Sequence, residues 1–267
     1  MTKTVLFHIT TLSNLHAGSG DQNFGVVDNL VQRDPVTEIP MINSSSLKGA
    51  IRDHFETQNL SKKKIETIFG HAEKDSASAG EVKFLPAHLL GLPVRSNTQL
   101  YFLATTPQIL EDYLSNYHIL KNETLDLNIP NVKEGVYIST NDEQCWIEDF
   151  EADNSKAQEL QKISKELFGS KPIVLMDERS FKTISLPIIT RNKIAKREEA
   201  DNNLFYEEVI PRHTLFYSYI ITPTDYDKSD EEDMKTIFDD FIANMNTNIQ
   251  VGANASIGYG ICQFKEV

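Results

Sequence analysis

The order of strand-like and helix-like segments constrains the fold of this chain more than any other feature of its sequence. Apolar and polar residues alternate from Thr4 to Leu12, which predicts a strand. Further strands are predicted near Val82, near Phe216 and through Phe264. One amphipathic helix is predicted between the first two of these strands and another between the last two. The resulting order is β-α-β-β-α-β.

Each of these helices has a capping signal and an apolar stripe. The first is predicted from Leu47 to about Glu56, with Ser46 as its N-cap and with Leu47, Ile51 and Phe55 facing inward. The second is predicted from about Asp230 to Met245, with Ser229 and Glu232 as a capping box.

The remaining segments have weaker signals. Helices are expected over Lys62 to Phe69, after the Thr106-Pro107 start signal, and over Lys156 to Phe168. Strands are expected over Glu81 to Leu89 and Gln99 to Thr105, and loops over His71 to Gly80 and the irregular, acidic 122–154 segment.

The β-α-β-β-α-β order is that of an α+β, ferredoxin-like (RRM-like) fold. Residues 1–105 and 213–267 are expected to form this domain, and 106–212 to form a large insertion. Since sheets of this shape bind RNA in many proteins, RNA is a candidate ligand.

The charge distribution bears on this expectation. The net charge of −13 argues against binding nucleic acid by bulk attraction. However, Arg179 to Arg197 holds six basic residues and no acid, whereas Asp142 to Glu159 holds seven acids and one lysine. The acidic surplus is segregated, so the charge distribution is compatible with a local basic groove.

Several classes of protein are disfavoured by composition. No run of about 18 apolar residues occurs and the N-terminus is not typical of a signal peptide, so a cytoplasmic protein with no membrane association is expected. The two cysteines lie far apart, and the seven histidines have no zinc-type spacing.

The candidate functional residues gather between Leu15 and Arg52. Two glycine-containing loops flank Asp28, a carboxylate that can bind a divalent ion or orient a ribose hydroxyl, unless it only bonds its own turn. His16 is a candidate general base, although a lone histidine is more often structural. The loop lacks the ending of a P-loop, which excludes nucleoside triphosphate binding of that kind.

Phosphate binding is expected from the serine-rich loop that enters the first helix, where amides, hydroxyls and basic side chains meet. A well-capped helix with a solvated basic face is the alternative. The residues concerned are Ser44, Ser45, Ser46, Lys48 and Arg52.

Two further groups are candidates for RNA contact. Arg191, Lys193 and Lys196 belong to the basic segment, which otherwise serves only solubility. Gly258 would let an RNA backbone approach closely, and Tyr259 would stack on a base, unless the two form a hairpin and part of the core.

The strings LHAGSG, VDNLVQRDPVTEIP, INSSSLKGAIRDHF and VGANASIGYG resemble the RAMP superfamily of CRISPR-associated proteins. The QRD that includes Gln32 and Arg33, with ITRNKIA and LFYEEVIP, is most similar to the backbone nuclease subunit of type III-B (Cmr) effectors. The acidic segment from 122 to 168 matches no motif of that family.

This resemblance implies a hand-like subunit with an RRM-like palm, fingers and an inserted β-hairpin thumb at about 180–212. Such subunits stack into a helical filament on CRISPR RNA, beside other Cmr-type subunits. They cut paired target RNA at six-nucleotide intervals. The resemblance gives Asp28 the role of cleavage residue, and Gln32 and Arg33 are expected to contact RNA.

The predicted function is therefore RNA-guided cleavage of single-stranded target RNA. Asp28 is expected to share a weakly held Mg²⁺ or Mn²⁺ with the RNA phosphate, and Glu207 or Glu208 to approach from the thumb, with Glu208 preferred. The alternatives are a non-catalytic guide-binding scaffold of a type III-A or related complex, and a guide-maturation endonuclease. The last would need a clearer histidine or lysine acid/base pair.

Overall fold

A computed structural model describes residues 2–20, 26–71, 77–193, 203–224 and 231–267. The chain divides into two compact units. Unit 1 comprises Met1–His88, Leu186–Arg212 and Phe216–Val267, and unit 2 comprises Leu89–Ser185 and His213–Leu215. These boundaries differ from those expected at 105/106 and 212/213, and the division into palm and insertion stays a prediction. Within the described residues no helix has the length and apolarity needed to span a membrane.

The sheet of unit 1 has the expected ferredoxin-like order. Its strands run β15-β16-β1-β14, and β5 pairs with β14. The first and last strands pair antiparallel, with Phe7 opposite Glu266 and Thr11 opposite Cys262. The strand bounds are β1 (Thr2–Thr11), β5 (Lys83–Phe84), β14 (Leu215–Pro223), β15 (Asn248–Gln250) and β16 (Ile261–Glu266).

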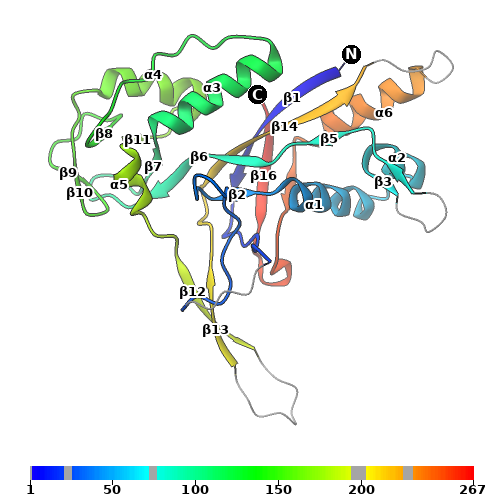
Figure 1. Cartoon of the computed structure of the whole chain (residues 1–267), viewed down its shortest axis with the longest axis horizontal. Helices are drawn as coiled ribbons and strands as arrows, with labels where there is room; N and C mark the ends of the chain where they lie inside the picture. The colour runs from blue at the N-terminus through cyan, green and yellow to red at the C-terminus, as the bar shows by residue number, and fades with distance from the viewer. Residues whose placement is uncertain (1, 21–25, 72–76, 194–202, 225–230) are drawn as a thin grey trace. The chain divides into compact units, whose positions relative to one another are not determined.

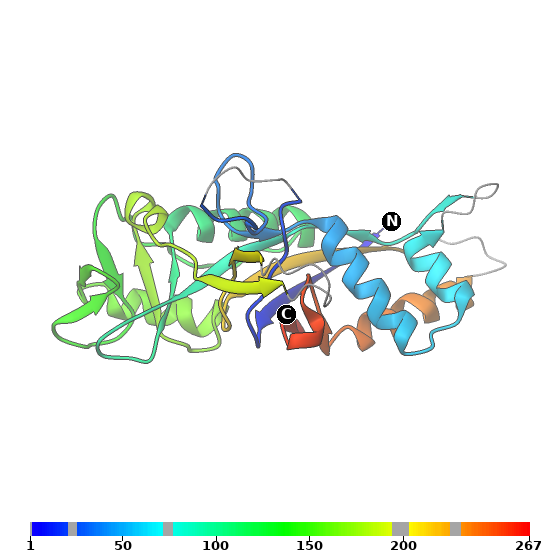
Figure 2. The ribbon, with the colours of Figure 1, turned by 90° about the horizontal axis from the view of Figure 1, so that it is seen from below.

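Helices α1 (Ser44–Thr57), α2 (Lys62–Phe69) and α6 (Glu231–Asn244) lie together at one end of unit 1 (Figures 1 and 2). They share an aromatic cluster with the sheet. The ring of Phe241 lies 5.1 Å from that of Phe55 and 5.9 Å from that of Phe69, which stacks on Phe84 of β5 at 5.4 Å. Aromatic pairs at these separations add to the stability of the apolar core.

The thumb is the expected β-hairpin, formed by β12 (Ile188–Lys193) and β13 (Asn203–Glu208) (Figure 1). The strands pair antiparallel, with Ile188 opposite Glu208. Because successive side chains of a strand point to opposite faces, Glu207 and Glu208 face different sides of the hairpin. Unit 1 also contains β2 (Met41–Ile42) and the short ribbon of β3 (Gly70–His71) and β4 (Ser78–Ala79).

In unit 2 the strands run in the order β6-β7-β11-β8, and β9 and β10 form a separate two-stranded ribbon. The chain passes from β7 to the parallel β11 through α3, whose N-terminus is capped as predicted because Thr106 Oγ1 accepts a hydrogen bond from Ile109 N at 3.2 Å. Its elements are β6 (Ala87–Val94), β7 (Phe102–Thr105), α3 (Pro107–Lys121), β8 (Val136–Ile138), β9 (Cys145–Ile147), β10 (Phe150–Ala152), α4 (Ala157–Leu167), β11 (Ile173–Met176) and α5 (Glu178–Lys182).

Four local predictions were wrong. The loop expected over His71 to Gly80 contains β4 and the end of β3. The 122–154 segment, expected to be irregular, contains β8, β9 and β10, and the single strand expected over Glu81 to Leu89 is divided between β5 and β6. Ser46 is not the cap of α1. The helix begins at Ser44 after Asn43, which makes no side-chain cap bond. The predicted capping box of α6 lies outside the described residues and side chains.

Candidate functional site

The base of the thumb hairpin is bonded to both N-terminal loops by short β-like bridges. Leu15 and Ile210 exchange two backbone hydrogen bonds of 2.8 Å. Gly18 bridges Val31 within the loops, and Asn29 bridges Glu207 of β13. Segments distant in the sequence thus form one backbone scaffold.

Asp28 is held by the backbone of β13. The amides of Asp28 and Asn29 both donate to the carbonyl oxygen of Tyr206 at 3.1 Å, and Tyr206 N donates to Asp28 Oδ2 at 2.7 Å. The side chain is exposed, and its second oxygen, Oδ1, has no partner among the described residues. One oxygen therefore fixes the carboxylate and the other is open to a ligand.

His16 is buried, and its tautomer follows from its contacts. The ring Nδ1 lies 2.7 Å from the carbonyl oxygen of Glu208. Since a carbonyl only accepts, Nδ1 carries a proton and donates it. Nε2 lies 3.7 Å from Glu207 Oε1, and a Cβ added at Gly18 would lie 3.1 Å from Nε2. Glycine at position 18 therefore leaves this nitrogen room.

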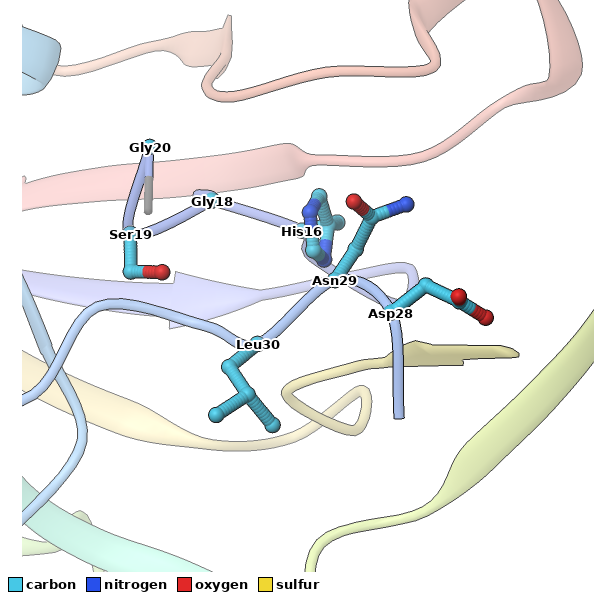
Figure 3. A pocket seen from close by; sticks show the side chains of 7 residues that line it. All are labelled: His16, Gly18, Ser19, Gly20, Asp28, Asn29 and Leu30. Carbon is cyan, nitrogen blue, oxygen red and sulfur yellow. The ribbon is translucent and has the colours of Figure 1, made fainter. Parts of the chain in front are cut away.

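A cavity of about 340 Å³ brings two of the three candidate catalytic residues, Asp28 and His16, together. Figure 3 shows the side chains of Asp28 and Asn29 extending from the loop on a different side from Leu30. The lining residues are His16, Gly18, Ser19, Gly20, Asp28, Asn29 and Leu30. Glu208, expected to act here, is not among them.

Two arginine–glutamate pairs form what is called the hairpin base: Arg33, Arg191, Glu207 and Glu208. Glu207 is 4% exposed. Its two carboxylate oxygens accept hydrogen bonds from Asn254 Nδ2, at 3.2 and 3.0 Å, and its Oε2 forms an ion pair with Arg191 Nε at 3.1 Å. The Arg191 guanidinium lies over the ring of Tyr259, 4.6 Å from its centroid. Arg191 and Tyr259, both expected to contact RNA, are thus engaged with the protein.

Glu208 faces the other side and has both carboxylate oxygens engaged. Its Oε2 accepts from Val31 N at 3.1 Å, and its Oε1 accepts from Arg33 Nη2. Glu208 is 7% exposed, and Arg33 also donates to the carbonyl oxygen of Glu38 at 3.2 Å. Two residues expected to contact RNA or the scissile phosphate therefore pair with each other.

Gln32 connects the loop that lines the cavity to the start of α1. Its Nε2 donates to Gly18 O at 3.1 Å and to Ser46 Oγ at 2.8 Å, while its Oε1 accepts from Asn43 N at 2.7 Å. This contact explains why Ser46 does not cap α1. The Ser46 hydroxyl is used by Gln32, and the helix starts earlier.

The term α1 start is used here for Ser44, Ser45 and Lys48. None of their side chains has a hydrogen bond or ion pair to the described residues. Arg52, one turn beyond Lys48, is engaged: it donates to Glu56 Oε1 at 2.7 Å and to Gly70 O at 3.3 Å. The α1 start can bind phosphate without breaking a contact within the described residues.

Three further residues were predicted to contact RNA. Lys193 is the last residue of β12, and the structure describes its backbone alone. Lys196 lies outside the described residues. Gly258 is exposed with φ +81°, and a Cβ there would meet nothing within 4 Å, so the position is open to close approach.

The donor set does not fit a divalent ion held by protein alone. Within the described residues no three His, Cys, Asp or Glu side chains are placed to share a metal. Asp28 is the one carboxylate lining the cavity. The carboxylates of Glu207 and Glu208 are paired with arginines and hydrogen-bonded to amides. The expected Mg²⁺ or Mn²⁺ stays a prediction.

Sequence reasoning missed two positioning residues in the loop before β16. Asn254 holds Glu207, and Gly252 (φ +79°) packs so closely that a Cβ would lie 2.4 Å from the carbonyl oxygen of His16. Among the glycines of GANASIGYG, Gly252 marks a close backbone approach whose partner, residue 16, is 236 positions away.

Comparisons with known proteins agree with this architecture. The sequence model of the RAMP superfamily matches residues 8–263. The CRISPR system Cmr endoribonuclease Cmr4 of Pyrococcus furiosus is 29% identical, over 99% of this chain and 97% of the relative. The crystal structure of oligomeric Cmr4 from Pyrococcus furiosus superposes with a TM-score of 0.76 at 23% identity, covering 99% of this chain and 98% of that one. A type III-B Cmr-beta structure bound to cognate target RNA gives 0.76 at 20% identity, covering 99% and 97%.

Proposed function

The chain belongs to the RAMP superfamily, and from this premise we propose that it is a guide-binding backbone subunit of a type III-B effector that cleaves target RNA. The full-length similarity to a Cmr endoribonuclease supports RNA cleavage and assembly with Cmr-type subunits. Cutting at six-nucleotide intervals, stacking into a helical filament on CRISPR RNA and a cytoplasmic location belong to the same proposal.

One observation carries the assignment of the cleavage residue. Asp28 is exposed at a cavity that His16 also lines, and it is the carboxylate there with an unengaged oxygen. Its other oxygen is fixed by the hairpin backbone. A prepositioned group with one open acceptor suits catalysis, because little reorganisation is needed when the substrate binds.

The chain's own groups suggest attack by the ribose 2′-hydroxyl of the target RNA. Asp28 Oδ1 accepts the hydroxyl hydrogen bond, orients the oxygen in line with the phosphate and takes the proton as the 2′-oxygen forms a bond to phosphorus. His16 Nε2, the other proton acceptor at the cavity, receives that proton from Asp28. The bond from phosphorus to the 5′-oxygen then breaks, and water supplies the proton to that oxygen.

The backbone of the RNA would be held elsewhere on unit 1. The amides and hydroxyls at the α1 start, with Lys48, suit phosphate groups, and Gly258 allows close approach. Sequence specificity would come from guide pairing, because contacts of this kind carry no base information.

The test is single-turnover cleavage of a labelled target RNA by the reconstituted effector complex. Asp28→Ala is expected to slow cleavage by about 10² to 10⁴-fold while target binding is kept. Asp28→Asn keeps an acceptor for Tyr206 N but lacks the negative charge, and is expected to be nearly as slow. Asp53→Ala, an exposed acid on α1, is the matched control and should cut normally.

Each outcome separates the candidates. Cuts spaced six nucleotides apart that vanish with Asp28→Ala, and at target positions carrying 2′-deoxyribose, support the proposal. Unchanged cutting in the variant moves the chemistry to another residue or subunit. A wild-type complex that binds target and cuts nothing would leave this chain as the non-catalytic scaffold of the alternative assignment.

A further inference from the structure

Glu208 bonds to the loop that carries Asp28 through both its backbone and its side chain. Its backbone N donates to Asn29 O at 2.9 Å, and its backbone O accepts from His16 Nδ1 at 2.7 Å. Its side chain accepts from Val31 N and from Arg33. This one residue therefore bonds to the segment that follows Asp28 and to His16, which lines the same cavity.

Arg33 completes the arrangement. Its side chain is 32% exposed, and its guanidinium joins Glu208 Oε1 to the carbonyl oxygen of Glu38. The ion pair thereby connects the loop to the hairpin across 175 residues of sequence. A carboxylate as buried as that of Glu208 is costly unless it is paired and fully hydrogen-bonded, and here it is both.

We propose that Glu208 and Arg33 are a pair of positioning residues that lock the segment carrying Asp28 against the thumb. Arg33 acts through Glu208, and Glu208 acts through Val31 and Asn29 on Asp28. In this role Glu208 is not a catalytic acid, and Arg33 does not contact RNA. The inference rests on the proposed cleavage for its activity readout, but the pairing itself is testable without RNA.

The test is a double-mutant cycle of Glu208→Gln and Arg33→Met. Glutamine keeps an oxygen for Val31 N but removes the counter-charge of Arg33, and methionine removes the cation at similar length. The double variant buries no unpaired charge. Coupled residues show non-additive effects, whereas independent ones do not.

Each single variant is expected to slow single-turnover cleavage by about 10- to 100-fold, because a small misplacement of a reacting group has effects of that size. Target RNA affinity should stay within about twofold, since neither residue is proposed to touch RNA. The double variant should be no slower than the slower single variant. The same non-additivity should occur in the thermal unfolding midpoint of the isolated chain.

Three results would overturn the proposal. The first is a double variant whose slowing equals the product of the two single effects. The second is a loss of RNA affinity with Arg33→Met, which would make Arg33 an RNA contact. The third is a Glu208→Gln variant that cleaves slowly although its thermal unfolding midpoint equals that of wild type, which would make Glu208 catalytic.

Folding and function are kept apart by two measures. If Arg33→Met does not fold, Arg33→Lys takes its place. Arg33→Lys keeps the charge, and we expect it to cleave more slowly while it still binds RNA. If the wild-type complex cuts nothing, the proposed function fails, while the unfolding cycle still decides whether residues 33 and 208 form a pair.

Discussion

The hairpin base and the α1 start both carry side chains of the types that bind phosphate, yet they use them in opposite ways. At the hairpin base Arg33 and Arg191 pair with two buried glutamates. At the α1 start Lys48 and two serine hydroxyls have no partner among the described residues. The burial of the two glutamates explains the pairing at the hairpin base, because a buried charge requires a partner, whereas the half-buried Lys48 faces no such requirement. Residue type alone therefore does not identify an RNA contact.

The sharpest way to break this comparison is to remove a buried charge at the hairpin base. Glu207→Leu leaves Arg191, whose side chain is 15% exposed, without its counter-ion and Asn254 without its acceptor. The free energy of unfolding should fall by about 3–5 kcal/mol, as for other buried ion pairs that lose one partner. Urea unfolding of the isolated chain measures this loss.

The control is an exposed ion pair in the same unit. Arg52 and Glu56 lie one helical turn apart with side chains 39% and 47% exposed, so Glu56→Leu should change stability by less than about 1 kcal/mol. Equal losses in the two variants would contradict the distinction between buried and exposed charges.

A second test concerns the glycines that support the two regions. Gly252 and Gly258 both have positive φ, but a Cβ at Gly252 would lie 2.4 Å from His16 O, whereas one at Gly258 meets nothing within 4 Å. Gly258→Ala should therefore lower the free energy of unfolding by about 1–2 kcal/mol, because alanine is strained at a positive φ. Gly252→Ala should lower it by about 1–3 kcal/mol more, because its Cβ is also overpacked.

Thermal unfolding of both variants, with cleavage assays of the complexes, checks this prediction. Gly252→Ala should also slow cleavage, because the carbonyl that must move belongs to His16. Equal unfolding midpoints for the two variants would show that the loop yields without strain, and that the close approach does not hold the histidine.

Acid provides a third test, through a histidine outside both regions. Burial, together with the nearby Lys265, lowers the pKa of His8 to about 4. The unfolded chain, with its histidine near 6.5, binds more protons between these values, so stability is full above pH 6.5 and falls as the pH falls towards 4. About 2 kcal/mol should be lost between pH 7 and pH 5.

This acid loss should be the same in Glu207→Leu and in Lys48→Ala, and smaller in His8→Gln. Urea unfolding at the two pH values makes the comparison. If His8→Gln retains the full loss of unfolding free energy between pH 7 and pH 5, another titrating group is responsible for that loss.

The smallest expected effect belongs to the α1 start. Lys48→Ala should leave stability within about 0.5 kcal/mol of wild type, because its side chain supports no described contact. RNA affinity should fall, and the salt dependence of log affinity should lose about 0.7 to 0.9 in slope, as for one phosphate contact. Lys62→Ala, an exposed lysine that pairs with Glu66, is the control and should change neither quantity.

The elements that the sequence predicted correctly are those whose signals repeat within a few residues. The alternation of β1, the stripe of α1 and the closing Gly70 of α2 are local patterns. The three-residue strands β8, β9 and β10 are too short to show alternation. β8 pairs with the distant β11, and β9 and β10 pair with each other across a tight turn.

The site follows the same rule. Asp28 and His16 could be proposed together because 12 positions separate them in one glycine-rich stretch. The pairing of Arg33 with Glu208 spans 175 residues, and that of Asn254 with Glu207 spans 47, so no local pattern predicts either. For these side chains the sequence indicated charge and hydrogen-bonding capacity, and the fold determines which group each one bonds.

The bond between the His16 ring and Glu208 also has a consequence for the timing of biosynthesis, because 192 residues separate its two ends. A ribosome adds about 5–20 residues per second, so about 10 to 40 seconds pass between the synthesis of the histidine and that of its partner strand. Helices α1 and α2 can form during that interval from local contacts. The cavity cannot, and a nascent chain therefore emerges with its scaffold begun and its cleavage centre still unassembled.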